Sequence, residues 1–337
     1  MKTNLKGIKD LDDFIVSIGE KPYRANQIWK WLWLKGVADF DSMTDISKST
    51  RTKLDELCYI GKLELADRRK SKIDGSEKFL FVLEDGSKIE SVLIPDRRRT
   101  TVCISTQVGC SLSCTFCATG VMDYTRDLKW WEIVDQIVQI KKLTHSKITN
   151  VVMMGMGEPF LNYDEVISSA RFINKKLQIG ARKITISTAG IVPGIRKFAA
   201  EPEQFKLAIS LNSTSDRHRE VLMPINRKYP IVDLIKAVRY YTRKKRKRVT
   251  FEYVLIRDIN DSPDDALSLA KLLKGIPCKI NLIPYNRIGK AGFEPPSKKC
   301  VERFRNTLYK LCPTTTIRES RGSDIKAACG QLKAESR

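Results

Sequence analysis

The stretch that decides the fold is Cys110-Ser-Leu-Ser-Cys114-Thr-Phe-Cys117, in which three cysteines follow the spacing C-x3-C-x2-C. An apolar run over residues 101–108 leads into it, and Gly109 stands directly before the first cysteine. The pattern predicts a strand that runs into a tight loop, with three thiolates directed at one place. Thiolates hold iron–sulfur clusters, and they also bind zinc.

Two kinds of metal site fit this spacing. A cubane cluster held by only three cysteines leaves one iron without a protein ligand, and that iron can bind a small molecule. A zinc ion would need a fourth ligand, supplied by Cys103 or by a more distant cysteine. The chain has nine cysteines, an odd number, and shows no apolar signal segment near Met1, so we do not expect a disulfide framework. The cysteines therefore indicate metal binding or catalysis in a reducing cytoplasm.

The composition is that of a soluble globular protein with a sizeable core. The 337 residues are 42% hydrophobic and 30% charged, and no apolar run is long enough to cross a membrane. The net charge is +22, of which residues 1–100 contribute +3 and the remainder +19. This excess favours a polyanionic partner, above all nucleic acid; a basic surface without a specific partner is the alternative. The basic run at residues 243–248 is a candidate for phosphate contacts.

The first hundred residues divide into two predicted parts. Residues 1–75 are predicted to form a small helical accessory domain, for which the family resemblance described below implies a role in RNA recognition. Apolar spacing indicates its helices near residues 10–18, 22–36 and 47–57. The buried stripe of the second helix leaves Trp31 exposed. In residues 76–100 two alternating stretches flank Asp85-Gly86 and predict a β-hairpin. Glu90, in its second strand, is either an outward-facing residue or a partly desolvated proton acceptor.

Strands and helices alternate through residues 101–317. Strands are predicted near residues 101–106, 148–155, 183–188, 205–211, 248–256 and 278–284, each followed by a helix. Six β/α units in series indicate a parallel sheet covered by helices, and six are too few to close an eight-stranded barrel. We therefore predict an α/β fold: an open partial (β/α)6 barrel with a helical accessory domain and a β-hairpin extension. Residues 318–337 form a C-terminal tail that carries Cys329.

Polar residues and glycines follow several of these strands. In folds of this class, function gathers where the strands end. Gly157 and Glu158 follow the second strand, and a carboxylate there suits a ligand with an ammonium group. The polar residues that end the third, fourth and sixth strands are Ser187, Ser210, Asn212 and Asn286. Together these strand ends could surround one small ligand with ribose and amino-acid groups.

The chain resembles the RlmN/Cfr family of radical S-adenosylmethionine (SAM) RNA methyltransferases over nearly its whole length. The most specific motifs are Gln107-Val-Gly-Cys-Ser-Leu-Ser-Cys-Thr-Phe-Cys-Ala-Thr-Gly120, Gly155-Met-Gly-Glu-Pro-Phe160, Pro224-Ile-Asn-Arg-Lys228, Leu282-Ile-Pro-Tyr-Asn286 and Arg318-Glu-Ser-Arg-Gly-Ser-Asp-Ile-Lys-Ala-Ala-Cys-Gly-Gln-Leu332. The resemblance implies that Cys110, Cys114 and Cys117 hold a [4Fe-4S] cluster whose open iron binds SAM. It implies SAM contacts by Gly157, Glu158, Ser187, Ser210, Leu211, Asn212 and Asn286.

The resemblance also implies a reaction that uses two molecules of SAM per turnover. Cys329 would take a methyl group from the first, and a radical made from the second would turn that methyl into a carbon radical. This radical would add to C2 of an adenine, with Glu90 as the matching proton acceptor. Cys103 would then close a transient disulfide with Cys329 and release the product. Adenine C2 is electron-poor, so a radical route avoids the need for a nucleophile.

The implied substrates are an adenosine in the peptidyl-transferase region of 23S ribosomal RNA and an adenosine beside the anticodon of tRNA. We expect a monomeric, cytoplasmic enzyme. Its remaining partner would be a reducing electron donor, for which a flavodoxin-like protein is one candidate. Two alternatives stay open. A sister enzyme of the same family, the Cfr type, methylates adenosine at C8 and shares most of the residues named above. The other alternative is a non-catalytic, zinc-stabilised RNA-binding protein.

Overall fold

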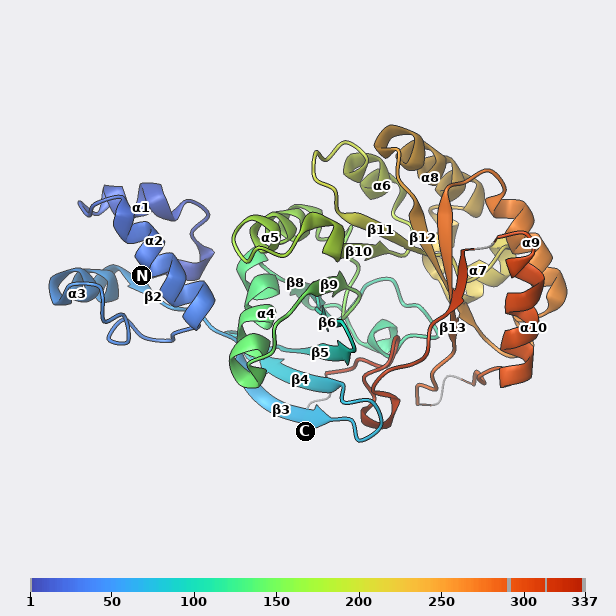
Figure 1. Cartoon of the computed structure of the whole chain (residues 1–337), viewed down its shortest axis with the longest axis horizontal. Helices are drawn as coiled ribbons and strands as arrows, with labels where there is room; N and C mark the ends of the chain where they lie inside the picture. The colour runs from blue at the N-terminus through green and yellow to red at the C-terminus, as the bar shows by residue number, and fades with distance from the viewer. Residues whose placement is uncertain (1, 290–291, 313, 335–337) are drawn as a thin grey trace.

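The computed structural model describes residues 2–289, 292–312 and 314–334, and its centre is one mostly parallel sheet (Figure 1). Within these residues the sheet has ten strands, in the order β14 (Thr315–Ile317), β13 (Cys278–Pro284), β12 (Val249–Leu255), β11 (Lys206–Ser210), β10 (Ile184–Thr188), β9 (Asn150–Met153), β6 (Arg99–Cys103), β5 (Lys88–Asp96), β4 (Glu77–Val82) and β3 (Glu64–Lys70). Strands β14 and β3 are its two edges, so the described part of the sheet does not close into a barrel. The predicted open partial barrel is confirmed.

Seven neighbouring strands, β6 and β9 to β14, pair in parallel. The helices of this part are α4 (Trp130–Thr144), α5 (Tyr163–Lys175), α6 (Val192–Phe198), α7 (Asp216–Leu222), α8 (Ile231–Lys245), α9 (Pro263–Leu273) and α10 (Lys298–Tyr309). All six predicted β/α units are present. Helix α7 was not predicted, because its seven residues are mostly charged and show no apolar stripe. Among the described helices, none combines the length and the apolar character that a membrane crossing requires.

Strand β12 shows how the sheet divides its two faces. Val249, Phe251 and Tyr253 are fully buried. They alternate with Thr250 and Glu252, which line a cavity inside the partial barrel. Because successive side chains of a strand point to opposite faces, one face of β12 packs into the core and the other supplies polar groups to the interior.

Strands β5, β4 and β3 extend the sheet with antiparallel pairing. The predicted hairpin is confirmed: β4 and β5 pair up to Val82 and Lys88, and Gly86 in the turn has a φ of +81°. Strand β3 was not predicted, because its sequence is dominated by charged residues. It lies at the edge of the sheet, where charged side chains discourage pairing with other chains. The segment 1–75 thus contributes one strand to the central sheet.

Three helices form the accessory part, as predicted. They are α1 (Leu11–Ser17), α2 (Tyr23–Lys30) and α3 (Lys48–Leu57), beside a small two-stranded sheet of β1 (Thr3–Asn4) and β2 (Cys58–Tyr59). The prediction that Trp31 is exposed is wrong: its ring is buried, and its Nε1 donates a hydrogen bond to Asp45 Oδ1 at 2.5 Å. After α2 the chain widens into a π-helical turn, Trp31–Lys35, which breaks the period on which the prediction rested.

A buried ion pair fixes the accessory part to the barrel. Lys6 Nζ lies 2.6 Å from Asp135 Oδ1 on α4, and both side chains are fully buried. The aromatic rings of Trp33, Trp130 and Phe172 pack against one another, and Lys6 Nζ lies 5.4 Å from the ring centre of Trp33. The accessory helices therefore hold a defined position on the outer side of α4 and α5 (Figure 1).

The segment after β14 crosses the open side of the partial barrel. The backbone N–H of Gly322 donates to Asp74 Oδ2 at 2.7 Å, and that of Lys72 donates to Asp324 Oδ2 at 3.1 Å. These bonds fasten the segment to the turn between β3 and β4. From there the chain returns toward the carboxyl ends of the parallel strands, where Cys329 lies.

Candidate active site

The cysteine loop, residues 109–117, begins where the short strand β7 (Gln107–Val108) ends. Strand β7 pairs with β8 (Arg126–Asp127), so the loop is closed at its base. Gly109 opens the loop with a φ of +75°, and a Cβ there would lie 2.0 Å from the carbonyl oxygen of Asp123. Only glycine fits this position. The backbone N–H of Cys117 donates to the carbonyl of Cys114 at 3.2 Å, which curls the loop as the sequence predicts.

The thiols of this loop have raised pKa values. Burial raises the pKa of Cys110 to about 12 and that of Cys114 well above its usual range, and the neighbouring Cys117 thiol adds to both effects. At neutral pH these groups are protonated, so a metal must displace the protons to create thiolates. The cysteines of a cluster site bind different irons, whereas a zinc site gathers its ligands around one ion at about 2.3 Å.

Glu158 joins the ends of two neighbouring strands. Its carboxylate is buried and accepts hydrogen bonds from the backbone N–H groups of Phe160 (2.9 Å) and Ala189 (2.7 Å). Burial raises its pKa to about 7. Gly157 has a φ of +97°, and a Cβ there would lie 2.5 Å from the Cβ of Gln107. The loop after β9 is therefore pressed against the start of the cysteine loop, as a shared ligand site requires.

The other predicted SAM residues lie at the carboxyl edge of the sheet with different degrees of access. Ser210 and Asn286 are half-buried, whereas Leu211 is fully buried. Asn212 has a φ of +59°, and its side-chain oxygen accepts a hydrogen bond from the backbone N–H of Val254 at 2.9 Å. The Asn212 side chain therefore links the end of β11 to β12. Ser187, on the neighbouring strand β10, is 9% exposed. The structure gathers all these positions at one edge; their contacts with SAM stay a prediction.

Arg219, on helix α7, is a residue of this edge that the sequence analysis missed. Its side chain is fully buried and donates to the carbonyl oxygens of Leu211 (3.0 Å) and Ala189 (2.6 Å). Burial lowers its pKa to about 10, and a thiolate at Cys114 would act in the opposite direction. The only signal in the sequence is an arginine inside a charged stretch, which is typical of an exposed helix.

The C-terminal segment is bonded directly to the cysteine loop. The backbone N–H of Ala118 donates to the carbonyl of Gly330 at 2.7 Å, and Thr119 Oγ1 donates to the carbonyl of Leu332 at 2.6 Å. Asn286 Nδ2 donates to the carbonyl of Cys329 at 3.2 Å. Cys329 is exposed, so the segment holds its thiol at the surface of the site beside the loop that carries Cys117.

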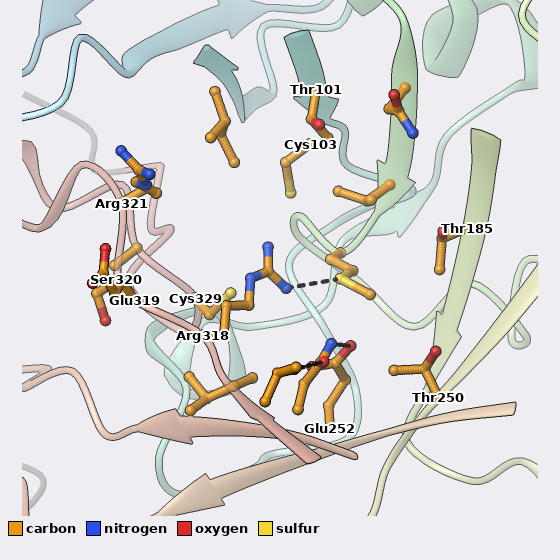
Figure 2. Close-up of a pocket in the computed structure, with 18 of the residues that line it drawn as sticks. Thr101, Cys103, Thr185, Thr250, Glu252, Arg318, Glu319, Ser320, Arg321 and Cys329 are labelled. Atoms are coloured by element: carbon orange, nitrogen blue, oxygen red, sulfur yellow. Dashed lines mark hydrogen bonds between the residues drawn. The ribbon is translucent and has the colours of Figure 1, made fainter. Parts of the chain in front are cut away.

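Cys103 and Cys329 line the same cavity, which has a volume of about 600 Å³. Figure 2 shows the side chain of Arg318 between them, with Glu252 on the other side of the cavity. The nearby Cys329 raises the pKa of Arg318, and burial raises the pKa of Cys103 to about 12. Both cysteines are free thiols. One oxygen of Glu252, Oε2, is buried and has no hydrogen-bond partner among the described residues.

Glu90 lies on the other side of the C-terminal segment. It is buried, not outward-facing; its Oε1 lies 2.8 Å from Lys78 Nζ, and its Oε2 accepts a hydrogen bond from the backbone N–H of Lys333 at 2.9 Å. Burial raises its pKa, and Lys78 opposes this shift. Glu90 lines a second cavity of about 830 Å³, whereas Cys103 and Cys329 line the first. The structure thus brings the two cysteines together but keeps Glu90 behind a wall formed by the C-terminal segment.

The basic run at residues 243–248 lies away from this edge. It covers the last residues of α8 and the turn before β12, which places it at the amino ends of the strands. Lys245 and Lys247 donate to backbone carbonyls of Glu201 and Gln204. Arg227 and Lys228, which follow α7, are both exposed. These two belong to the motif at residues 224–228, which follows the helix whose end is bonded to the cysteine loop.

Two family models match the chain. Residues 104–270 match the radical SAM superfamily, and residues 3–60 match the ribosomal RNA large subunit methyltransferase N-terminal domain. Over 334 residues the chain is 48% identical to the probable dual-specificity RNA methyltransferase RlmN of Thermoanaerobacter sp. (strain X514), covering 98% of this chain and 97% of that protein. It is 43% identical to the dual-specificity RNA methyltransferase RlmN of Anaeromyxobacter dehalogenans (strain 2CP-C), over 96% of this chain and 90% of that protein.

A solved structure is also similar over the whole chain. It is a radical SAM methyltransferase from Sphaerobacter thermophilus, which superposes with a TM-score of 0.94 at 42% identity. The match covers 99% of this chain and 100% of that one. The accessory helices, the partial barrel and the C-terminal segment therefore all have counterparts in one known protein.

Proposed function

The chain belongs to the RlmN family of radical SAM RNA methyltransferases, and we propose that it methylates C2 of adenosine through a methyl group carried on Cys329. The proposed substrates are 23S ribosomal RNA, in the peptidyl-transferase region, and tRNA, next to the anticodon. Membership of the radical SAM superfamily implies a [4Fe-4S] cluster and SAM. It favours the cluster over the zinc-stabilised RNA-binding alternative.

The observation that carries the proposal is the shared cavity of Cys103 and Cys329. A carrier cysteine must reach the place where SAM is bound, and a resolving cysteine must then reach the carrier. Cys329 lies one residue before Gly330, whose carbonyl is hydrogen-bonded to Ala118 of the cluster-bearing region. Cys103 lies at the end of β6 and faces the same cavity. Both requirements are compatible with this geometry.

The proposed binding residues follow from the same edge of the sheet. Cys110, Cys114 and Cys117 would hold the cluster, and two molecules of SAM would be used per turnover. When bound, the cluster and SAM supply the methyl group and the radical reactivity. The proposed SAM contacts are Gly157, Glu158, Ser187, Ser210, Leu211, Asn212 and Asn286. The chain's own task is to hold these groups at the carboxyl edge and to keep Cys329 near them.

Glu90 is the proposed proton acceptor, and the C-terminal segment controls its access. In the structure its carboxylate is held by Lys78 and by the backbone of Lys333. For Glu90 to receive a proton from an adenine bonded to Cys329, the segment between the two cavities must shift. RNA that presents an unpaired adenine is the natural cause of such a shift, because RNA recognition favours splayed-out bases.

The partners of the reaction follow from its chemistry. Ribosomal RNA and tRNA are polyanions, which suits the charge of +22. A reducing electron donor, flavodoxin-like or otherwise, must supply the electron for the cluster. We propose a monomer that works in the cytoplasm, where both RNA substrates are found.

The test is the variant Cys329→Ala, assayed on ribosomal RNA and on tRNA with the anaerobically reconstituted enzyme. We expect no methylated adenosine, and mass spectrometry of the wild-type protein should find S-methylation on Cys329. The matched control is Cys312→Ala, a half-buried cysteine that does not line the cavity, which should keep full activity. Methylation that survives in Cys329→Ala would refute the carrier role. Locating the methyl group at C8 in the product would favour the Cfr-type reaction.

A further inference from the structure

Arg219 is a fully buried cation whose hydrogen-bond partners are all uncharged. Its guanidinium donates to the backbone carbonyls of Leu211, Ala189 and Ser210 and to the side-chain oxygen of Asn226, at distances between 2.6 and 3.3 Å. No carboxylate of the described residues lies within ion-pair distance of it. The carboxylate that acts on it, that of Asp216, is itself bonded to Asn226 and to the backbone N–H of Ile231.

Such an arrangement is costly unless something negative completes it. Removing a cation from water carries a large desolvation penalty, and neutral carbonyls compensate only part of it. Elsewhere in this chain a fully buried cation has its partner: Lys6 lies 2.6 Å from Asp135. The site of Arg219 therefore lacks the negative charge that its burial calls for.

The place where that charge would sit is the cysteine loop. The end of α7 is bonded to this loop, because the backbone N–H of Thr115 donates to the carbonyl of Leu222 at 3.1 Å and Thr115 Oγ1 donates to that of Val221 at 3.1 Å. Cys114, the neighbour of Thr115, is close enough to interact with the charge of Arg219. The three carbonyls to which Arg219 donates lie at or just after the ends of β10 and β11, beside the proposed SAM contacts.

We propose that Arg219 is the counter-charge of the iron–sulfur cluster, so that its guanidinium favours the reduced, more negative state. This inference rests on the proposed function, because it requires the cluster on Cys110, Cys114 and Cys117. A cluster bound by thiolates is anionic, and one more electron increases its negative charge. Net charge and nearby charges are among the factors that set cluster potentials. Arg219 would influence the reaction through the charge of the cluster, without contacting the RNA substrate.

A purely structural role would look different. If Arg219 served only to hold the ends of β10 and β11, the number and direction of its hydrogen bonds would matter and its charge would not. Lysine keeps the charge but cannot make the same set of bonds, whereas glutamine keeps hydrogen-bonding ability without charge. The two substitutions therefore separate the two roles.

The experiment is a redox titration of the reconstituted cluster, followed by electron paramagnetic resonance, with iron content measured in parallel. The proteins are the wild type, Arg219→Lys, Arg219→Gln and the control Arg217→Gln, which changes an exposed residue of the same helix. In Arg219→Gln we expect the ratio of reduced to oxidised cluster at a fixed potential to fall at least tenfold, which is 59 mV for a one-electron couple. Arg219→Lys and Arg217→Gln should stay within about threefold of the wild type.

The outcomes separate this inference from the proposed function. A titration of Arg219→Gln that matches the wild type overturns the inference, and so does a shift in Arg219→Lys as large as that in Arg219→Gln. If Arg219→Gln binds no cluster, Arg219→Lys decides: wild-type cluster content and potential support the charge role, and loss of the cluster overturns it. A wild-type protein that takes up no cluster would refute the proposed function, and this inference with it.

Discussion

Two buried cations show how differently two regions of this molecule are built. At the junction between the accessory helices and the barrel, Lys6 lies 2.6 Å from Asp135, and both side chains are fully buried. At the carboxyl edge of the barrel, Arg219 is just as buried but donates only to uncharged oxygens. The junction also satisfies the second oxygen of Asp135, which accepts a hydrogen bond from the backbone N–H of Leu63 at 2.9 Å.

Two buried carboxyl groups of the barrel likewise have no ion-pair partner among the described residues. Glu252 Oε2 accepts no hydrogen bond from these residues, and Glu158, whose oxygens accept hydrogen bonds from backbone N–H groups, has its pKa raised to about 7 by burial. Buried ionisable groups in proteins are nearly always paired, so three of them without an opposite charge in one region need an explanation. We infer that the chain itself supplies the opposite charge at the junction, whereas the cluster and SAM are the charged partners of the other region. Each prediction below tests one side of this contrast.

The largest effect is expected at a cluster ligand. Cys114→Ala removes one of three thiolates, and we expect loss of nearly all bound iron and at least a 1,000-fold loss of RNA methylation, on the order of removing a key catalytic group. Iron analysis and a methylation assay on the reconstituted protein measure both. Cys300→Ala, a half-buried cysteine outside the site, should change neither. A Cys114→Ala protein that keeps its cluster would mean that another residue is the ligand.

The next effect concerns the junction and should appear without any cofactor. Asp135→Ala leaves Lys6 buried without a counter-ion, and we expect the free energy of unfolding to fall by about 3–5 kcal/mol. Urea denaturation of the cluster-free protein measures this. The double variant Lys6→Met with Asp135→Leu should recover most of the loss, because both charges are then gone. A single variant as stable as the wild type would show that the junction does not depend on the pair.

The sequence could predict most of the barrel, but only part of the difference between the junction and the active-site edge. Strands such as β9 and β12 are apolar and β-branched, so the six β/α units are readable from pattern alone. The cysteine loop and the strand ends were recognisable because their residue types carry chemistry. Helix α7 and strand β3 were not, since their mostly charged sequences show no periodic apolar face. Whether a charged residue such as Arg219 is buried depends on contacts from distant segments, which no local pattern records.

The separation of Glu90 from Cys329 could not be predicted for the same reason. The family resemblance implies roles for both residues, but only the structure shows that the C-terminal segment lies between them. The burial of Trp31 was also unpredictable, because no sequence pattern indicates the π-helical turn that contains it. Sequence patterns thus identify the chemical groups of this site, and tertiary contacts decide which groups face one another.

The buried ionisable groups without an opposite charge should also affect how the stability of the protein changes with pH. Burial raises the pKa of Glu158 from 4.5 to about 7, so the folded protein prefers the protonated carboxyl. The resulting stability is fully present below about pH 4.5 and is lost as the pH rises through about 7, in total about 3 kcal/mol. Glu158→Gln should remove this part of the pH dependence in urea denaturation of the cluster-free protein.

The difference between variants is the quantity to compare, because burial also raises the pKa of Glu90 and Glu252. Glu302→Gln, at an exposed position on α10, is the matched control and should follow the wild type at every pH. A Glu158→Gln protein whose stability changes with pH as the wild type does would place the titration elsewhere. Burial of the Glu158 carboxyl group would then not contribute to the pH dependence of stability.

The smallest effect is expected for an ion pair that is exposed to solvent, which can be compared with the buried pair of Lys6 and Asp135. Lys197 Nζ lies 2.6 Å from Asp164 Oδ1, the same distance as in the Lys6–Asp135 pair, but their side chains are 53% and 83% exposed. Water screens this pair, and Lys197 also keeps its contact with the ring of Tyr163 at 4.2 Å. Asp164→Ala should therefore lower the free energy of unfolding by less than about 1 kcal/mol, and added salt should reduce the difference further. Equal losses in Asp164→Ala and Asp135→Ala would show that distance alone, and not burial, decides what an ion pair contributes to this fold.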